Sequence, residues 1–286
     1  MSIQLGIRLH DVNTDLGDSE KTMEARAKKA ASEGFSCVHL ALGKVLKGFS
    51  PAERNMTEGL AMHVKHVFEK ENLDIAVLGC YLNLAHPDPG KLADIQSRYY
   101  AHMRVAALCG AGVVGTETGA PNAEYKLDGN THSEEALMTF IRNLEPVVER
   151  AESYGVSVAI EPVWNHIVYN PDRALRVIKE IQSRNLRIIF DPVNLLCMEN
   201  ADRKEEVFEE AMDKLGDYIA VVHLKDFARK DGKLISIAAG TGEMDYRKIL
   251  HWLKQEKPYI QATLENTVNA NAVSSREYLQ RIYTEE

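Results

Sequence analysis

Residues 156–192 read VSVAIEPVWNHIVYNPDRALRVIKEIQSRNLRIIFDP and contain one complete strand–helix–strand unit. The apolar runs 156–161 and 187–191 predict two strands. The segment 170–184 predicts a helix, with Asn170 as its N-cap and Pro171 at the first helical position. Strands that are separated by a helix lie parallel and are joined by a right-handed crossover. This stretch therefore predicts an α/β fold with a parallel sheet.

The same unit repeats along the whole chain. Further apolar runs predict strands at 3–9, 36–42, 74–79, 112–117, 219–223 and 260–265. Helical patterns are expected at 19–34, 54–72, 91–110, 133–154, 202–216, 245–256 and 271–283. Eight alternating strand and helix units close naturally into a (β/α)8 TIM barrel. Because no linker interrupts the series, we expect a single TIM-barrel domain over residues 1–286.

Composition and charge make several classes of partner improbable. The chain has 34 Lys and Arg against 42 Asp and Glu, a formal net charge of -8, and no basic run, so a nucleic-acid partner is not expected. No segment reaches the ~18 apolar residues of a membrane span, and the first residues lack signal-peptide features, which predicts a cytoplasmic protein without a membrane partner. Four scattered cysteines predict small buried side chains rather than disulfides or zinc ligands: Cys37, Cys80, Cys109 and Cys197.

Residues 110–115, GAGVVG, match the spacing of a dinucleotide-binding motif. That motif requires a strand before the glycines and a helix after them, and here the predicted order is reversed. We interpret the glycines as the end of one helix and the turn into the next strand.

Each of the last four predicted strands ends in a side chain that can bind a metal ion. These side chains are Glu161, Asp191, His223 and Glu265. The carboxyl ends of TIM-barrel strands form one rim, where catalytic groups lie. Carboxylates that converge at the end of apolar strands are costly to bury without a cation. The pattern therefore predicts a divalent metal site, and the alternative is four separate surface or salt-bridge residues.

An oxygen-rich ligand set favours Mn²⁺, with Mg²⁺ or Co²⁺ as alternatives and Zn²⁺ less suited. Such an ion binds the vicinal oxygens of a hydroxy-ketone and stabilises the enediolate that forms when the neighbouring carbon loses a proton. Glu161 and Glu265 come from different strands and are our candidates for the catalytic acid/base pair.

Several motifs carry a family resemblance: IEP at 160–162, FDPVN at 190–194, HLKD at 223–226, GTGEMDY at 240–246 and LEN at 264–266. With these motifs the chain resembles the sugar phosphate isomerase/epimerase superfamily with xylose isomerase-like TIM barrels, in particular the ketose 3-epimerases and L-xylulose-5-phosphate 3-epimerase-like proteins. The resemblance implies a metal held by Glu161, Asp191, His223 and Glu265, with the two glutamates catalytic. It further implies a substrate contact by Arg229, a sugar or sugar phosphate substrate, and a dimer or tetramer.

One position departs from the ketose 3-epimerase pattern. Those enzymes usually have a histidine three residues after the metal-binding aspartate, and this chain has Asn194. An amide can bind a substrate hydroxyl but cannot titrate or ligate a metal in the same way. The substitution, together with ISIAA at 235–239, also counts against the related three-metal apurinic endonucleases.

Weaker candidates for the substrate site each have an ordinary structural alternative. His86, Trp164 and Glu117 follow or end strands and could contact substrate, or could serve in a loop hydrogen bond, in packing and in an ion pair. Lys225 and Asp226 could orient His223 or form a surface pair. Gly240 and Gly242 precede a helix, where TIM barrels often bind phosphate, although a simple turn explains them equally well. His166 is a further candidate beside the sugar.

The leading hypothesis is a metal-dependent epimerase or isomerase that acts on a ketose or ketose phosphate through an enediolate. One alternative is a lyase of the inosose dehydratase type, which begins with the same proton removal and then expels a hydroxyl. The other alternative is a sugar-binding barrel without catalytic activity.

Overall fold

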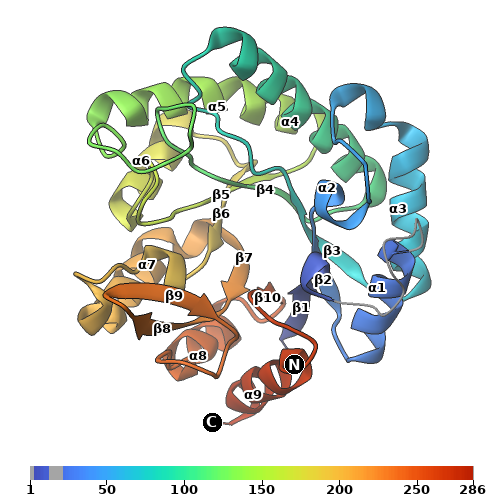
Figure 1. Cartoon of the computed structure of the whole chain (residues 1–286), viewed down its shortest axis with the longest axis vertical. Helices are drawn as coiled ribbons and strands as arrows, with labels where there is room; N and C mark the ends of the chain where they lie inside the picture. The colour runs from blue at the N-terminus through green and yellow to red at the C-terminus, as the bar shows by residue number, and fades with distance from the viewer. Residues whose placement is uncertain (1–2, 13–21, 286) are drawn as a thin grey trace.

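The computed structural model describes residues 3–12 and 22–285 and contains a closed parallel barrel (Figure 1). The eight barrel strands follow one another around the barrel in the order β1-β10-β7-β6-β5-β4-β3-β2. Their bounds are β1 Gln4–Arg8, β2 Cys37–Leu40, β3 Asp74–Gly79, β4 Val113–Glu117, β5 Val158–Glu161, β6 Leu186–Phe190, β7 Ile219–Leu224 and β10 Gln261–Leu264. The predicted TIM barrel is therefore confirmed.

A ring of helices surrounds the barrel, as Figure 1 shows. The main helices are α1 Thr22–Ser32, α3 Glu58–Lys70, α4 Pro89–Cys109, α5 Glu134–Tyr154, α6 Pro171–Ile181, α7 Lys204–Leu215, α8 Arg247–Glu256 and α9 Ala272–Thr284. Each corresponds to a predicted helix, and positions 19–21 of the first prediction lie outside the described residues. Short helical turns join the units: η1 Leu9–Asp11, α2 Leu42–Val45, η2 Glu53–Asn55, η3 Val193–Leu195, η4 Ala201–Arg203 and η5 Gly216–Tyr218.

The helix ends follow local sequence signals. The side chains of Ser133 and Asn170 accept hydrogen bonds from backbone N–H groups in the first turns of α5 and α6, as N-caps do. Gly110 ends α4 in the left-handed conformation, with φ 76°, and β4 begins three residues later. The run 110–115 is thus a helix cap and turn, as expected, and not a dinucleotide-binding motif.

Two strands that form a hairpin were not predicted. The strands β8 (Asp226–Lys230) and β9 (Lys233–Ile237) form an antiparallel hairpin between β7 and α8. Its two-residue turn, Asp231 and Gly232, has positive φ at both positions (51° and 71°), which an Asp-Gly pair readily adopts. The sequence therefore contained a hairpin signal, the Asp-Gly pair, in the segment between β7 and α8, where the strand–helix repeat predicts a loop.

The barrel has two apolar layers. One small cluster fills its interior with side chains from β2 to β7, and it contains Cys37, Ala76, Val77, Val113, Ala159, Ile189 and Val221. The main core lies between the strands and the helices. The four cysteines are free thiols, and all but the half-buried Cys197 are buried, as expected. Within the described part of the chain, no helix is both long enough and apolar enough to cross a membrane.

Candidate metal centre

The four predicted metal ligands lie together at one rim of the barrel. Glu161 ends β5, Asp191 directly follows β6, His223 lies near the end of β7, and Glu265 directly follows β10. These four strands are neighbours in the barrel, and all four side chains are buried. Glu161 and Glu265 line a cavity of about 500 Å³. The parallel strands therefore bring together residues that are up to 104 positions apart in the sequence.

The distances within this cluster suit a metal ion. The Nδ1 atom of His223 lies 3.4 Å from Oε2 of Glu161 and 3.5 Å from Oε1 of Glu265. One ligand atom from each of Glu161, Asp191 and His223 lies within 4.8 Å of the other two. Atoms that are each about 2.0–2.2 Å from one ion are separated by comparable distances, so only a small contraction is needed.

His223 has the polar atoms that a metal would satisfy. Its side chain is fully buried, and neither ring nitrogen has a hydrogen-bond partner among the described residues. Burial by itself would lower the pKa of His223, but the carboxylates of Glu161 and Glu265 outweigh it and raise the pKa to about 9. In the metal-free protein a proton on His223 therefore supplies positive charge to the carboxylates, and the donor set fits a divalent cation.

Lys225 supplies a permanent cation beside this cluster. Its buried Nζ lies 2.7 Å from Oδ2 of Asp191 and 3.1 Å from Oε2 of Glu265. Its backbone is held by Tyr246, whose hydroxyl donates to the Lys225 carbonyl and accepts from the Lys225 N–H. Burial opposes the charge, but Asp191 and Glu265 raise the pKa of Lys225. The alternative of a surface pair with Asp226 is wrong, because both side chains are buried.

Glu265 remains ionised despite its burial. Burial would raise its pKa, but Lys225, His223 and Arg8 together lower the pKa well below its usual range. The Nη1 atom of Arg8 lies 3.6 Å from Oε1 of Glu265. Glu265 is therefore an ionised carboxylate in the metal-free protein.

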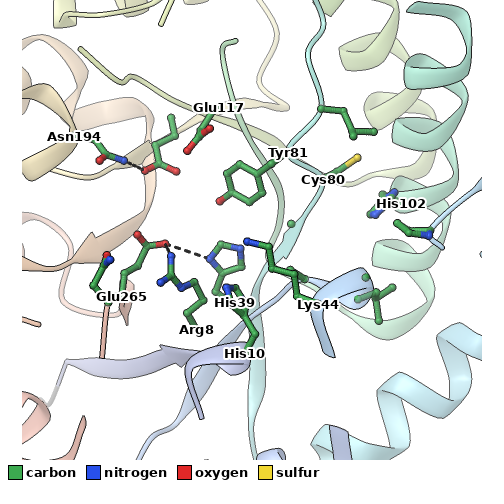
Figure 2. A pocket seen from close by; sticks show the side chains of 18 of the residues that line it. Arg8, His10, His39, Lys44, Cys80, Tyr81, His102, Glu117, Asn194 and Glu265 are labelled. Atoms are coloured by element: carbon green, nitrogen blue, oxygen red, sulfur yellow. Dashed lines mark hydrogen bonds and ion pairs between the residues drawn. The ribbon is translucent and has the colours of Figure 1, made fainter. Parts of the chain in front are cut away.

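Two further predicted residues lie beside Glu161. Glu117, at the end of β4, is its cross-strand partner, and burial followed by the charge of Glu161 raises the pKa of Glu117 to about 7. The Tyr125 hydroxyl donates to Oε2 of Glu117 over 3.2 Å. The Asn194 amide donates to Oε1 of Glu161 over 2.6 Å, and both Glu117 and Asn194 line the cavity (Figure 2).

The other predicted substrate residues do not line this cavity. Arg229 lies on the β8–β9 hairpin, where its guanidinium is 2.6 Å from Asp202 and 3.5 Å from Glu243. His86 uses Nδ1 to accept a hydrogen bond from the backbone of the loop that precedes α4. Trp164 is 39% exposed and lies beside a different cavity. His86 thus makes the loop hydrogen bond that was its structural alternative, Arg229 pairs with carboxylates on the surface, and Trp164 neither lines this cavity nor belongs to the core.

His166 and the glycine turn also have structural partners. The Nδ1 atom of His166 lies 3.9 Å from Oε2 of Glu117, and burial lowers the pKa of His166 to about 4. The backbone N–H groups of Gly240 and Gly242 both donate to Oδ2 of Asp226. These amides are therefore committed to a carboxylate, and the turn is not an open phosphate site.

Asp226 holds the whole loop that follows the hairpin. Its buried carboxylate accepts hydrogen bonds from the N–H groups of Phe227, Gly240, Gly242 and Met244. Hydrogen bonds to a charged group contribute about 1.5–3 kcal/mol each, so we expect Asp226→Ala to lower the free energy of unfolding by about 3 kcal/mol or more. Urea denaturation measures the change, with the exposed Asp202→Ala as the matched control. Equal stability of the two variants would contradict this role of Asp226.

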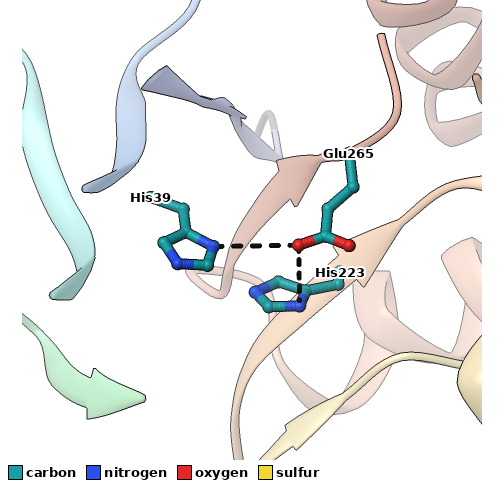
Figure 3. A group of neighbouring side chains, drawn as sticks. All are labelled: His39, His223 and Glu265. Carbon is teal, nitrogen blue, oxygen red and sulfur yellow. Dashed lines mark ion pairs between the residues drawn. The ribbon is translucent and has the colours of Figure 1, made fainter. Parts of the chain in front are cut away.

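Sequence reasoning missed several residues of the cavity, among them His39 and Arg8. His39 is only 3% exposed, its ring stacks on His223 at 5.2 Å and 14°, and its Nδ1 lies 3.8 Å from Oε1 of Glu265 (Figure 3). Neither of its ring nitrogens has a hydrogen-bond partner among the described residues. A histidine inside the apolar run 36–42 and an arginine in the run 3–9 were visible signals, but the metal-site prediction used only the ends of the last four strands.

Comparison with known proteins places this architecture in a family. A family model for the xylose isomerase-like TIM barrel matches residues 27–282. A probable L-ribulose-5-phosphate 3-epimerase of Mycoplasma pneumoniae is 30% identical over 144 residues, which are 50% of this chain and 44% of that protein. The matched region spans about half the length of the curated relatives.

Two solved structures show the same fold over nearly the whole chain. A D-tagatose 3-epimerase-like protein has a TM-score of 0.74 at 19% identity, over 98% of this chain and 97% of that one. The IolI protein, solved with a zinc atom, has a TM-score of 0.74 at 15% identity, over 99% of this chain and 98% of that one. With the family model covering most of its length, the chain belongs to the xylose isomerase-like TIM-barrel family.

Proposed function

We propose that this protein is a divalent-metal-dependent epimerase or isomerase of a ketose or ketose phosphate. One observation carries the proposal: the buried side chains of Glu161, Asp191, His223 and Glu265 lie together at one rim of the barrel, where Glu161 and Glu265 line a cavity and the ring nitrogens of His223 have no hydrogen-bond partner among the described residues. We propose Mn²⁺ as the ion because three carboxylates and one imidazole form an oxygen-rich set, with Mg²⁺ and Co²⁺ as alternatives.

The residues of the cavity supply a base and an acid on different sides. Glu161, Asp191, His223 and Glu265 would hold the divalent ion, which would supply Lewis-acid polarisation of the substrate carbonyl and positive charge to offset the enediolate. Glu265, which its cationic neighbours keep ionised, removes the proton from the adjacent carbon. Glu161 takes a proton from Glu117 beside it on the next strand, whose pKa is raised to about 7, and delivers this proton to the carbon. Solvent then reprotonates Glu117 and removes the proton from Glu265. Asn194 fixes the Glu161 carboxylate and remains a candidate for a substrate hydroxyl.

The comparisons support this proposal without naming the sugar. One relative is described as a probable L-ribulose-5-phosphate 3-epimerase, and one protein of the same fold as D-tagatose 3-epimerase-like. Another protein of the same fold binds zinc, which supports a divalent ion in this kind of barrel. A dimer or tetramer and a cytoplasmic location remain expectations from the resemblance and from the sequence.

The experiment that tests the proposal is solvent exchange. The Mn²⁺-loaded protein is incubated with a panel of ketoses and ketose phosphates in D₂O. A chelator then removes the paramagnetic ion, and NMR spectra of the sugars are recorded. Deuterium at a carbon next to the carbonyl, with all oxygens retained, is the expected result. Loss of water would identify a lyase instead, and the absence of both metal binding and exchange would identify a sugar-binding barrel without activity.

A further inference from the structure

Cationic side chains gather on one wall of the cavity. The first βα units form this wall, which contains Arg8 at the end of β1, His10 in η1 and Lys44 in α2. The rest of the lining includes Glu117 of β4, Glu161 of β5, Asn194 of η3, Lys225 after β7 and Glu265 after β10. The two parts meet where Arg8 lies close to Glu265, as Figure 2 shows. A substrate between Glu161 and Glu265 therefore has the cationic wall beside it.

Arg8 is held in a fixed orientation on this wall. Its Nε donates to Oδ2 of Asp11 over 2.9 Å, and its Nη1 lies 3.6 Å from Oε1 of Glu265. No described residue accepts a hydrogen bond from Nη2 of Arg8. A guanidinium that is anchored in this way presents its remaining N–H groups in a planar fork, the geometry that suits phosphate oxygens.

Lys44 adds a second positive charge at the cavity rim. It is exposed, and no carboxylate of the described residues lies within ion-pair distance of its ammonium group. His10 experiences the positive charge of this wall. Burial is the largest cause that lowers the pKa of His10, and the charges of Arg8 and Lys44 lower it further, to about 3. His10 is therefore neutral, and the positive charge of the wall comes from Arg8 and Lys44.

The usual phosphate position of a TIM barrel is closed in this chain. That position lies after the seventh and eighth barrel strands, where loop and helix N–H groups bind phosphate. Here the N–H groups of Gly240 and Gly242 already donate to Asp226. A phosphate group on the substrate would need cationic partners elsewhere, and the β1–α2 wall supplies them in the same cavity as the candidate catalytic residues.

We propose that Arg8 and Lys44 bind the phosphate of a phosphorylated ketose. Arg8 holds two phosphate oxygens through its fork, and Lys44 contributes a mobile point charge at the rim. This inference rests on the proposed function, because the reacting carbons then lie between Glu265 and Glu161. It narrows the substrate class to ketose phosphates.

A binding experiment tests the phosphate site without any turnover. Inorganic phosphate is titrated into the metal-loaded wild type and into the variants Lys44→Gln and Lys47→Gln, and calorimetry measures the binding. Lys47→Gln is the control, because Lys47 does not line the cavity. We expect Lys44→Gln to weaken phosphate binding about tenfold, as loss of a charge-assisted hydrogen bond does, and Lys47→Gln to change it less than about twofold. Equal affinity in the two variants, or no phosphate binding at all, would overturn the proposal.

A second experiment compares a ketose 5-phosphate, the free ketose and a ketose carboxylate as substrates. We expect the phosphate ester to be preferred, and Lys44→Gln to raise its KM about tenfold with a much smaller change in kcat. Lys44→Arg, which keeps the charge, should restore most of the affinity. Preference for the free sugar or the carboxylate would overturn the phosphate assignment. A further outcome separates the two proposals. If no ketose is converted but Lys44→Gln still has a lower affinity for inorganic phosphate than the wild type, the proposed function is wrong and the phosphate site is supported.

Discussion

Glu265→Gln is expected to reduce turnover of an identified ketose by about 10²- to 10⁴-fold. The amide is nearly isosteric with the carboxylate but cannot accept the proton that the reaction removes from carbon. The wild-type carboxyl is kept ionised by Lys225, His223 and Arg8, so at neutral pH the substitution removes a carboxylate that carries no proton. Initial rates from NMR measure the effect, and circular dichroism with a thermal melt shows whether the fold is retained.

The matched control is Glu277→Gln on α9, which changes an exposed glutamate that does not line the cavity. Its rate should equal that of the wild type. If Glu265→Gln retains more than about a tenth of the wild-type rate while its melt is unchanged, Glu265 is not the catalytic base.

Lys225→Met is expected to lower the free energy of unfolding of the metal-free protein by about 3–5 kcal/mol at pH 8. The substitution leaves Asp191 and Glu265 buried without the ammonium that lies 2.7 Å and 3.1 Å from their oxygens. Burial already raises the pKa of Asp191 to about 6, against the lowering effect of Lys225, and loss of the lysine raises it further. The folded variant then binds protons that the unfolded chain does not, so its deficit should shrink as the pH falls from 8 to 6.

Urea denaturation in the presence of chelator, at pH 8 and at pH 6, measures this deficit. Lys248→Met is the control, because it removes an exposed lysine from a surface ion pair with Glu209 and should change stability by no more than about 1 kcal/mol. A pH-independent loss, or a loss no larger than that of Lys248→Met, would show that Lys225 does not compensate the buried carboxylates.

The barrel could be predicted because its signal repeats. Each unit is an apolar run followed by a capped helix, and Asn170 and Ser133 act as the caps that the sequence indicates. The β8–β9 hairpin breaks this repeat, and beyond the buried Asp226 and Phe227 its residues are half-buried or exposed. The search for apolar runs therefore did not predict these two strands, although Asp231 and Gly232 indicate their turn.

The candidate metal centre could be predicted because the carboxyl ends of parallel barrel strands all lie at one rim, so residues at these ends are close in space. Glu161 and Glu265 illustrate this, since their strands close into one rim. Arg229 shows the limit of counting residues from a motif, because the hairpin places it beside Asp202 and Glu243 instead of at the cavity. The position of Lys225 depends on the hydrogen bond between its backbone N–H and the Tyr246 hydroxyl. No local sequence pattern relates these two residues.

Metal binding followed by calorimetry, with a count of the protons released, tests the central claim most directly. A ligating imidazole must be neutral, and the pKa of His223 is raised to about 9, so at pH 7 an incoming ion displaces its proton. We predict one Mn²⁺ per chain with release of about one proton, seen as heats that differ between buffers of different ionisation enthalpy, and an affinity that rises with pH toward about 9. Both the binding and the proton release should vanish in His223→Gln. The account is contradicted if the wild type binds no divalent ion, or if His223→Gln binds it with unchanged affinity.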